Sequence, residues 1–537
     1  MVEEDCTTHC ITIPFQKTGY FSKIICDYLD QKDTITPFYN NYPDLNGFKK
    51  QLEEKRLTVR ALSRNILVES LKNQYKNLTT SDKVKANIQL LQKENTFTVT
   101  TGHQLNLFTG PLYFLYKIVS TINLTKQLKA EFPSDNFVPI YWMASEDHDF
   151  EEINYFNFRD KKIRWNRESS GGVGRLSTEG LNEVLSVFSK EIGTPTNADY
   201  LKGLFKKGYL EHNTLSEATR FIANELFNKY GLVIVDGDDK KLKQVFAPII
   251  EDELLNQTSY QKVSKTISKL EKNYKIQVNP RDINLFYLTD GLRERILYEN
   301  EVYKVNNTEI SWSKGELTKH LYDKPERFSP NVIMRPLYQE MILPNLCYIG
   351  GGGELAYWFE LKAYFEAVKV PFPILLLRNS AILISDKQKL KLEKLKISIE
   401  ELFLGQQDLI SKKIKEVSDL EIDFSKQRNF LEAQFNDLEK IAKQTDKSFI
   451  GAVKAQQKKQ LNGLDRLERR LLKAEKRKHQ ELTHRIKKLQ DELFPNQSLE
   501  ERQRNFSEFY LEHGERLIPT LIETLDPLKI EFSILIV

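Results

Sequence analysis

The densest group of reactive side chains lies between residues 100 and 111, in the run Thr-Thr-Gly-His-Gln-Leu-Asn-Leu-Phe-Thr-Gly-Pro. Four of its side chains can transfer protons or hydrogen-bond, and two glycines let the backbone approach a ligand closely: His103, Gln104, Asn106, Thr109, Gly102 and Gly110. A β-like run precedes this turn and an apolar helical pattern follows it. A helix start presents free N–H groups to an anion. We therefore predict a nucleotide or substrate-phosphate site, with His103 as proton donor or cation; a plain helix cap is the alternative.

A second group of side chains, after the apolar run 137–143, is acidic. It contains Glu146, Asp147, His148 and Asp149. Open α/β sheets bind ligands at the carboxyl ends of their strands, and crowded acids shift one another's pKa values. We predict that Glu146, Asp147 and His148 are catalytic, in acid–base roles, and that Asp149 binds substrate. A helix start with acids in its first turn is the alternative. A metal site would need ligands from elsewhere in the chain, so we assign none.

A third group follows between residues 329 and 378. Arg335 stands between strand-like residues and a proline, which suits a fixed contact with a carboxylate or phosphate. The run of four glycines at 350–353 opens a helix and again favours an anion. From this region we predict binding roles for Arg335, Gln339, Gly351, Gly352, Gly353, Glu354, Tyr357, Trp358 and Arg378. For Tyr357 and Trp358, a place in the apolar core is the alternative.

The elements that must position these groups follow a strand, helix, strand order. The runs 96–100, 111–130 and 137–143 predict a βαβ unit and hence a parallel sheet. The runs 231–238 and 373–378 predict further buried strands. The fold class is therefore α/β, with residues 1–385 as a parallel-sheet core interrupted by insertions at about 161–225 and 260–325. We expect short strands at 275–278 and 285–288 within the second insertion.

From residue 386 the sequence becomes proline-free and rich in Lys, Glu, Leu and Gln. Apolar positions step by three and four with one extra four-residue step, as in coiled coils. Residues 386–494 are therefore predicted to form a helical coiled coil that folds back at 445–451, and 495–537 to return to the core with a final strand. The basic run 454–488 could suggest RNA binding. Its interleaved acids are more typical of a solvated coiled-coil face, so we do not expect a nucleic-acid partner.

Bulk composition excludes several classes of protein. The net charge of +4 arises from 79 basic and 75 acidic residues, which does not argue for nucleic acid or membrane as a partner. No apolar run is long enough to span a membrane, and the acidic N-terminus does not resemble a signal peptide. The four cysteines are Cys6, Cys10, Cys26 and Cys347. We expect reduced thiols in a cytoplasmic protein rather than a metal site.

These motifs together resemble the BshC family, the cysteine-adding enzymes of bacillithiol biosynthesis. The match is carried by Thr101–Gln104 with Phe108–Tyr113, Trp142–Glu152, Ser329–Asn331, Arg335–Pro336, Gln339–Glu340, Gly350–Glu354, Tyr357–Trp358 and Leu499–Arg502. The resemblance implies a Rossmann-like core similar to that of class I aminoacyl-tRNA synthetases and nucleotidyltransferases, with two insertions. It also implies a C-terminal coiled coil that forms a homodimer. The turn Phe108–Pro111 lacks the two histidines that such synthetases carry.

The reaction that the resemblance implies is amide formation between the cysteine carboxyl group and the amino group of glucosaminyl-malate. ATP would be the co-substrate that activates the carboxylate, with or without Mg²⁺. Two alternatives stay open on the sequence alone. One is an aminoacyl- or nucleotidyl-transferase that acts on another acceptor, and the other is a non-catalytic pathway scaffold.

Overall fold

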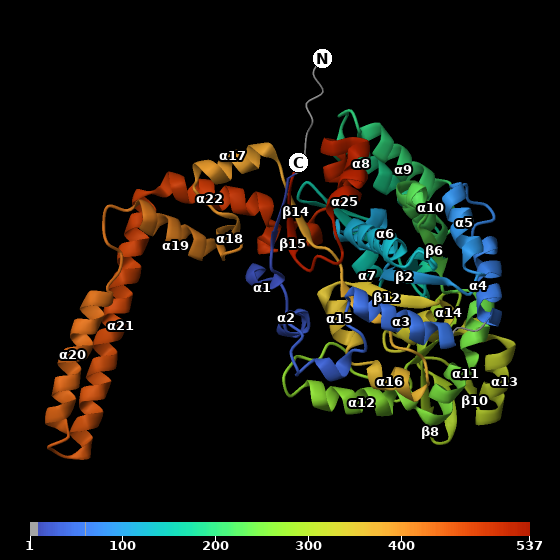
Figure 1. Cartoon of the computed structure of the whole chain (residues 1–537), viewed down its shortest axis with the longest axis horizontal. Coiled ribbons are helices and arrows are strands. Elements are labelled where there is room, and N and C mark those ends of the chain that lie inside the picture. The colour runs from blue at the N-terminus through green and yellow to red at the C-terminus, as the bar shows by residue number, and fades with distance from the viewer. Residues whose placement is uncertain (1–8, 59–60) are drawn as a thin grey trace. The chain divides into compact units, whose positions relative to one another are not determined.

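The computed structural model describes residues 9–58 and 61–537, and its chain forms two compact units (Figure 1). The first unit contains the described residues up to Gln16, then Tyr20–Leu383 and Glu500–Leu535. The second contains Lys17–Gly19, Ile384–Leu499 and Ile536–Val537. Cys6 lies outside the described residues, and Cys10, Cys26 and Cys347 are free thiols.

A five-stranded sheet forms the centre of the first unit, in the order β13-β12-β2-β3-β6. Its strands are β2 (Thr96–His103), β3 (Asn136–Met143), β6 (Val233–Asp236), β12 (Asn345–Gly350) and β13 (Ile374–Leu377). Every neighbouring pair in this sheet is parallel. Helix α6 (Tyr113–Glu131) makes the crossover from β2 to β3. The predicted βαβ unit and parallel sheet are therefore confirmed.

The register of the sheet brings the carboxyl ends of its strands to one edge. His103 of β2 pairs with Met143 of β3, and Met143 pairs with Asp236 of β6. The chain builds the sheet outward in one direction through β3 and β6, and in the other through β12 and β13. The order reverses between β2 and β12, which is where parallel α/β sheets bind their ligands.

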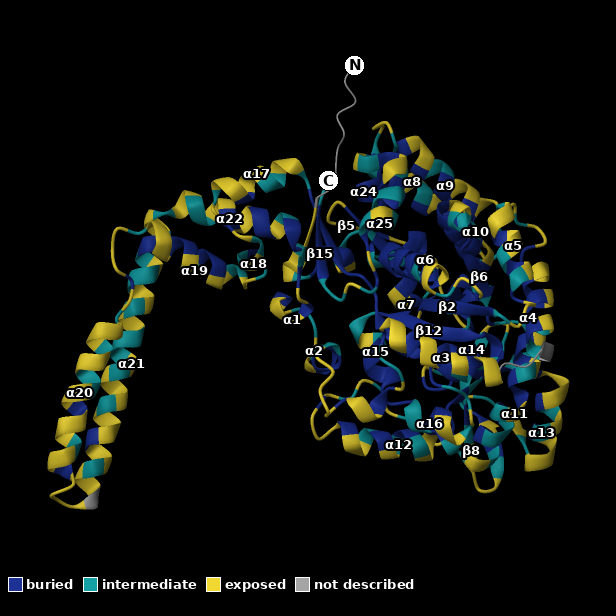
Figure 2. Ribbon diagram, in the orientation of Figure 1, coloured by how far each residue is buried: buried dark blue, intermediate teal, exposed yellow. Residues whose placement is uncertain are grey.

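The core beneath the sheet is one apolar cluster that joins strands to helices. Phe97 and Val99 of β2 and Ile349 of β12 pack with Leu124 and Leu128 of α6. Helix α3 (Leu45–Thr58) adds Phe48 and Leu52 to the same cluster. Figure 2 shows the central strands β2 and β12 as buried throughout. Both strands are covered on both faces, so the threonines that alternate with Phe97 and Val99 in β2 are buried as well.

The remaining helices and strands of the first unit surround this sheet. Before β2 come β1 (His9–Ile13), α1 (Phe15–Thr18), α2 (Lys23–Leu29), α3, α4 (Ala61–Gln74) and α5 (Asp82–Leu90). Between β3 and β6 come α7 (Phe150–Ile153), the hairpin β4 (Tyr155–Phe158) and β5 (Lys161–Arg164), then α8 (Leu181–Ile192), α9 (Ala198–Leu210) and α10 (Leu215–Phe227). After β6 come α11 (Lys240–Asn256) and α12 (Thr258–Leu270).

A second sheet, of order β10-β9-β8-β7-β11, is antiparallel where its pairs are described. It consists of β7 (Leu285–Thr289), β8 (Leu292–Glu299), β9 (Val302–Val305), β10 (Ser311–Trp312) and β11 (Phe328–Pro330), with α13 (Lys314–Asp323) between β10 and β11. The expected strand at 275–278 is wrong, because these residues form an irregular segment. Their backbone N–H groups bond to a buried carboxylate instead of a neighbouring strand, as described below.

The segment 331–384 and the C-terminal residues complete the first unit. Helix α14 (Arg335–Ile342) precedes β12, and two short helices, α15 (Gly352–Trp358) and α16 (Lys362–Ala367), follow the glycine run, where the sequence predicted that one helix begins. The last elements are α23 (Glu500–Gln503), α24 (Phe506–His513), α25 (Leu517–Thr524) and β15 (Phe532–Ile536). Strand β15 lies between β1 and β14 (Ala381–Ile384), so the expected final strand is confirmed.

The second unit is helical, as the sequence predicts. Its helices are α17 (Asp386–Lys394), α18 (Ile399–Leu402), α19 (Gln406–Val417), α20 (Ser425–Ala442), α21 (Lys447–Lys478) and α22 (Gln480–Leu493). Helices α20 and α21 lie side by side as a hairpin (Figure 1), held by Phe435, Ala442 and Val453. The chain reverses at residues 443–446, and Gly451 lies within α21. No described helix combines the length and apolar character needed to cross a membrane.

Candidate functional site

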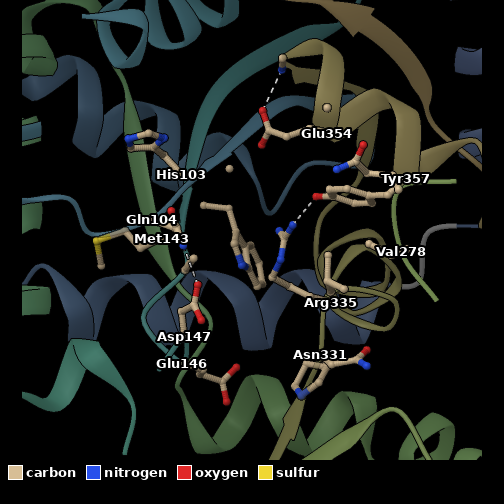
Figure 3. A pocket seen from close by; sticks show the side chains of 18 of the residues that line it. His103, Gln104, Met143, Glu146, Asp147, Val278, Asn331, Arg335, Glu354 and Tyr357 are labelled. Carbon is tan, nitrogen blue, oxygen red and sulfur yellow. Dashed lines mark hydrogen bonds between the residues drawn. The ribbon is translucent and has the colours of Figure 1, made fainter. Parts of the chain in front are cut away.

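A cleft of about 920 Å³ lies at the carboxyl edge of the parallel sheet, in the first unit (Figure 3). Thirteen of the predicted site residues line it: Gly102, His103, Gln104, Glu146, Asp147, His148, Arg335, Gly351, Gly352, Gly353, Glu354, Tyr357 and Arg378. They come from the ends of β2, β3, β12 and β13, from the start of α14 and from α15. The structure therefore brings the histidine turn, the acid cluster and the glycine run to one cavity.

Asp147 is held as a carboxylate at one end of the cleft. Its Oδ2 accepts a hydrogen bond of 2.9 Å from Gln104 Nε2, and its Oδ1 accepts one of 2.8 Å from the His148 backbone. Burial alone would raise its pKa. The hydrogen bonds from His148 and Gln104, with Arg293 nearby, outweigh burial and hold the pKa of Asp147 well below its usual range. Asp147 is thus suited to bind a cation and is a poor proton acceptor.

His148 faces Arg293, a residue of β8. The His148 Nδ1 atom lies 2.7 Å from Arg293 Nη1 and 3.6 Å from Asp147 Oδ1. A guanidinium can only donate, so Nδ1 is the acceptor in the shorter contact. Arg293 also lies over the Phe286 ring, with 3.9 Å between guanidinium and ring centroid. These contacts join the acid cluster of the parallel sheet to the antiparallel sheet.

Glu146 is the acid of this cluster that holds a proton most readily. Burial is the main cause that raises its pKa, and the carboxylate of Asp238 adds to it. An ion pair with Lys243 of α11 opposes the rise without cancelling it. Lys243 is fully buried and also donates to the Phe328 carbonyl over 2.6 Å. Glu146 therefore combines a fixed position with an affinity for protons that a general base needs.

Lys117 and Glu354 form an ion pair on the opposite side of the cleft. Lys117 Nζ lies 2.6 Å from Glu354 Oε2 and donates to the Gly102 carbonyl over 2.6 Å. Glu354 also accepts from the Gly351 backbone N–H over 2.7 Å and from the Tyr348 hydroxyl over 2.9 Å. Burial would raise the pKa of Glu354, but Lys117 and these donors lower it. The glycine run therefore binds a carboxylate of its own chain where an external anion was expected.

Arg335 is a cation of the cleft that donates hydrogen bonds to two tyrosines. Its Nη2 donates to the Tyr357 hydroxyl over 2.7 Å (Figure 3), and its side chain also bonds to Tyr348. Burial favours the neutral form, but Tyr357, Tyr348 and Glu354 outweigh it and raise the pKa, so the guanidinium keeps its charge. A Cβ on Gly102 would lie 3.1 Å from the Tyr348 hydroxyl and 3.4 Å from Arg335 Nη1. A glycine at this position lets Arg335 lie against the end of β2.

His103 is buried between Tyr113 and Phe114, with ring centroids 5.5 and 5.1 Å away. Burial, with the positive charges of Lys117 and Arg378, lowers its pKa well below the usual range, although a hydrogen bond with the Thr109 backbone opposes the shift. The ring is therefore neutral at physiological pH. The expectation of a cationic His103 is wrong. Burial and the two nearby cations disfavour the protonated ring, and only the hydrogen bond with the Thr109 backbone favours it.

Asn106, Thr109 and Gly110 do not line the cleft. Asn505 donates to the Phe108 and Gly110 carbonyls over 2.8 and 2.6 Å, and the Leu112 backbone N–H donates to the Arg504 carbonyl over 2.8 Å. The C-terminal segment thus holds the backbone of this turn, and it occupies the Leu112 N–H that could otherwise have bound a phosphate. Gly110 has a φ of +65°, and a Cβ there would lie 2.6 Å from the Asn106 Cβ, so the glycine serves the turn itself.

Three other predicted residues also lie outside the cleft. Asp149 is exposed at the start of α7. Gln339 is fully buried and donates to Glu340 over 3.2 Å. Trp358 is buried and stacks on Tyr348 with 4.5 Å between ring centroids, which is the core role given above as its alternative.

Arg378 lines the cleft, but its hydrogen bonds are used within the protein. Its Nη2 donates to Glu501 over 2.6 Å, and its Nη1 donates to the Asn379 carbonyl and the Ser380 hydroxyl. Its guanidinium also lies 4.9 Å from the Tyr113 ring centroid. Arg378 thus fixes α23 against the end of β13. Its expected substrate contact would have to be shared with Glu501.

Sequence reasoning missed several cations of the cleft: Lys117, Arg281, Arg293 and Arg502. Lys117 could have been found, because it is the only charged residue between Leu112 and Leu124 in an apolar helix. Arg281 lies in the irregular segment, Arg293 in β8 and Arg502 in α23. No local pattern connects these three to residues 102–148, so only the tertiary structure identifies them.

The two ends of the cleft are suited to different chemical groups. At one end the ionised Asp147, with Glu146 beside it, can hold and deprotonate an amine. The remaining wall carries the arginines at 281, 335 and 502, which suit carboxylates or phosphates. In the part of the chain that the structure describes, no group of three or more His, Cys, Asp or Glu side chains is placed to hold a metal ion.

Comparisons with known proteins cover the whole described chain. Residues 8–379 match the family model of the bacillithiol biosynthesis BshC N-terminal Rossmann-like domain, and residues 381–537 match that of the BshC C-terminal coiled-coil domain. A relative from Christiangramia forsetii, named "Putative cysteine ligase BshC", is 59% identical over 98% of this chain and 99% of its own. A relative of the same name from Cytophaga hutchinsonii is 41% identical over 96% of both chains.

A solved structure described as a putative arginyl-tRNA synthetase from Campylobacter jejuni covers 87% of this chain and 98% of its own, at 11% identity and a TM-score of 0.22. That score is too low to support an argument about the fold. The two family models and the close relatives agree over the full length. The chain therefore belongs to the BshC family of bacillithiol biosynthesis.

Proposed function

We propose that this protein is a ligase that joins the carboxyl group of cysteine to the amino group of glucosaminyl-malate, with ATP as co-substrate. The family and the names of its relatives support a cysteine ligase. The observation that carries the proposal to this cleft is that Asp147 and Glu146 line the same cavity as Arg281, Arg335 and Arg502. An acceptor that carries both an amine and carboxylates fits such a division of charge.

The proposed reaction forms a C–N bond between the cysteine carboxyl carbon and the acceptor nitrogen. Amide formation from a free carboxylate is uphill in water, so a carboxyl oxygen must first become part of a better leaving group. ATP supplies that activation when bound, and its phosphates would bring Mg²⁺ into the cleft. Arg281, Arg335 and Arg502 offer the charge that phosphates and the malate carboxylates need.

The acceptor amine must lose a proton before it can attack. Asp147, ionised by its hydrogen bonds from Gln104 and His148, binds the ammonium form. Glu146, whose pKa is raised by burial, then accepts the proton. Lys243 holds the Glu146 carboxyl group in place and limits its motion. Fixing amine and carboxyl in one cavity supplies much of the rate, since effective concentrations of oriented groups are high.

We also propose that the protein is a cytoplasmic homodimer that associates through the helical hairpin of the second unit. The hairpin exposes large apolar side chains on its surface, including Phe430 at 68%, Ile441 at 57% and Phe449 at 46% of their full exposure. Figure 2 shows exposed residues along both α20 and α21. Apolar groups in a row on an exposed helix favour association with a second helical surface.

One incubation tests the ligase proposal. Purified protein is mixed with cysteine, ATP and glucosaminyl-malate, and the thiol product and the released nucleotide are quantified by mass spectrometry. We expect bacillithiol in a fixed ratio to ADP or AMP, and no nucleotide release when either cysteine or glucosaminyl-malate is left out. Binding of all three substrates without product would contradict the proposal and favour a scaffold. Product that forms only when RNA is added would favour a transferase.

A further inference from the structure

A second, much smaller cavity lies behind His103. Its volume is about 10 Å³, and it is lined by His103, Gln104, Asn106, Thr109, Phe114, Tyr141, Tyr209, Thr219, Ile222 and Ala223. His103 and Gln104 also line the large cleft, so these two residues form the partition between the two spaces. We call this second space the His103 chamber.

Five polar atoms of the His103 chamber have no hydrogen-bond partner among the described residues. They are His103 Nε2, Asn106 Oδ1, Thr109 Oγ1, Tyr141 OH and Thr219 Oγ1. Four of these residues are at least nine-tenths buried, with exposures of 7% for His103, 7% for Thr109, 0% for Tyr141 and 9% for Thr219. Native proteins pair nearly all of their buried polar atoms, because an unpaired one destabilises the fold. Five of them around one cavity therefore point to a polar ligand.

The size of the chamber identifies that ligand. A cavity needs roughly 10–15 Å³ of this measure to hold one water molecule, and nothing larger fits at about 10 Å³. An apolar cavity of this size would stay dry, but this one offers five polar atoms. Buried water molecules typically make about three hydrogen bonds, a number that the chamber can supply.

The donor and acceptor types of the lining atoms also suit water. The His103 ring is hydrogen-bonded with the Thr109 backbone, and its unpartnered nitrogen is Nε2, so Nδ1 is the atom that faces Thr109. A neutral ring that donates from Nδ1 to a backbone carbonyl leaves a lone pair on Nε2. A water can donate to His103 Nε2 and to Asn106 Oδ1, and accept from the hydroxyls of Tyr141 and Thr219.

We propose that the His103 chamber is a binding site for one ordered water molecule, which holds His103 in its Nδ1–H tautomer. Tyr141 and Thr219 are then positioning residues: they fix the water, and the water fixes the ring that separates the chamber from the cleft. Gln104, the second residue of the partition, carries the effect to Asp147 through its 2.9 Å hydrogen bond. The two faces of the β2–α6 turn thus have separate roles, one toward the cleft and one toward a structural water.

Two measurements on the wild-type protein test this site. A crystal structure at a resolution that shows ordered water should contain a density peak within hydrogen-bond distance of His103 Nε2 and Tyr141 OH. The ¹⁵N spectrum of protein labelled at its eight histidines should show the Nδ1–H pattern for His103, assigned by its loss in His103→Gln. An empty, well-ordered chamber or an Nε2–H ring would overturn the proposal.

Single substitutions distinguish the effect of losing the water from a general effect on packing. Tyr141→Phe and Thr219→Val each remove one hydroxyl with little change in volume, and each should shift the His103 ¹⁵N resonances and weaken or abolish the water peak. Tyr364→Phe is the matched control, because Tyr364 is also fully buried with an unpartnered hydroxyl and does not line the chamber. It should leave the His103 resonances unchanged. Unchanged resonances in both Tyr141→Phe and Thr219→Val would refute the inference even if either variant lost stability.

Discussion

Lys117 Nζ lies 2.6 Å from Glu354 Oε2 on the wall of the cleft. Lys117 belongs to α6, which follows β2, and Glu354 belongs to α15, which follows β12. The pair therefore joins the two helices that start on either side of the point where the strand order reverses. The ion pair fixes the wall of the cleft at the position where ligands bind in such sheets.

Replacing Lys117 by Met should destabilise the protein strongly, because Glu354 would remain as a buried charge with no cation beside it. Removing one partner of a buried pair costs about 3–5 kcal/mol. The double variant Lys117→Met with Glu354→Gln should recover part of that loss, since it leaves no buried charge. Urea unfolding of the wild type, Lys117→Met, Glu354→Gln and the double variant gives the coupling free energy between the two side chains. Strictly additive losses would show that the pair does not act as a unit.

Asp147→Asn should lower kcat/KM by about 10²-fold or more, because the neutral amide cannot balance the charge of an ammonium group. The fold should be kept, since Asn has the same size and can still hydrogen-bond. Steady-state kinetics with each substrate varied in turn measures kcat/KM. Calorimetry measures the affinity for the nucleotide. Asp149→Asn serves as control, because this exposed acid lies outside the cleft. A collapse of nucleotide affinity in Asp147→Asn would place Asp147 in a cation site for the nucleotide instead.

Arg335→Lys should raise KM for an anionic substrate about 10-fold to 100-fold, because a hydrogen bond to a charged group contributes about 1.5–3 kcal/mol and lysine cannot reproduce the fork of the guanidinium. Turnover at saturation should fall less. Arg327→Lys, outside the cleft, should behave as wild type. Initial rates over a range of each substrate identify which one loses affinity. Equal KM values in both variants would remove Arg335 from substrate binding.

Glu360 should make stability depend on pH near neutrality. It is 1% exposed, its Oε1 accepts from the Gln277 backbone N–H over 2.9 Å, and burial raises its pKa to about 7 from an ordinary 4.5. Between pH 4.5 and about 7 the folded state binds more protons at Glu360 than the unfolded state does. The free energy of unfolding of the wild type therefore falls as pH rises through this range, by roughly 3 kcal/mol in all. Below pH 4.5 the carboxyl is protonated in both states and contributes no slope.

Glu360→Gln removes this slope, so its stability relative to wild type should increase across pH 4.5–7 and then level off. Thermal unfolding at a series of pH values measures the difference. Glu366→Gln, an exposed acid six residues on, should show a flat difference. A flat difference for Glu360→Gln as well would mean that Glu360 ionises normally. Because Gln277 and Val278 line the cleft, substrate affinity should follow the same pH range.

Phe430→Glu or Ile441→Glu should convert the proposed dimer to monomers, because each places a charge in an exposed apolar row of the hairpin. Asn436→Glu adds the same charge to the same helix at an exposed polar position and should leave the dimer intact. Sedimentation equilibrium gives the mass of each species. A dimer that persists in both apolar variants would exclude this surface, and a monomeric wild type would exclude the dimer.

The elements of the fold could be predicted from the sequence more completely than the details of the site. Strands such as Thr96–His103 were predictable because buried parallel strands are continuous in apolar and β-branched residues, and turns of glycine and polar residues follow them. The acid cluster was placed correctly for the same reason, since its position after β3 determines the edge of the sheet on which it lies.

The parts that failed depend on contacts between distant segments. The turn that contains Asn106 and Thr109 is held by Asn505, almost four hundred residues away, which donates to the Phe108 and Gly110 carbonyls. In the glycine run, the Gly351 N–H donates to Glu354 of the helix that follows. The cation Arg293 comes from an antiparallel strand whose sequence has no feature that points to the cleft. Local patterns identify which residues are able to act, and long-range packing decides which of them face the substrate.

Asn505 and Arg502 also determine when the site can first exist during synthesis. Both residues follow the entire helical segment Ile384–Leu499, yet they belong to the first unit, where one closes the β2–α6 turn and the other lines the cleft. A nascent chain released before residue 500 would lack both, however well its earlier strands had formed. Residue 505 must therefore have left the ribosome before this cleft can be complete. A shortened protein that keeps the cleft would have to be made by internal deletion, with residues 500–535 kept.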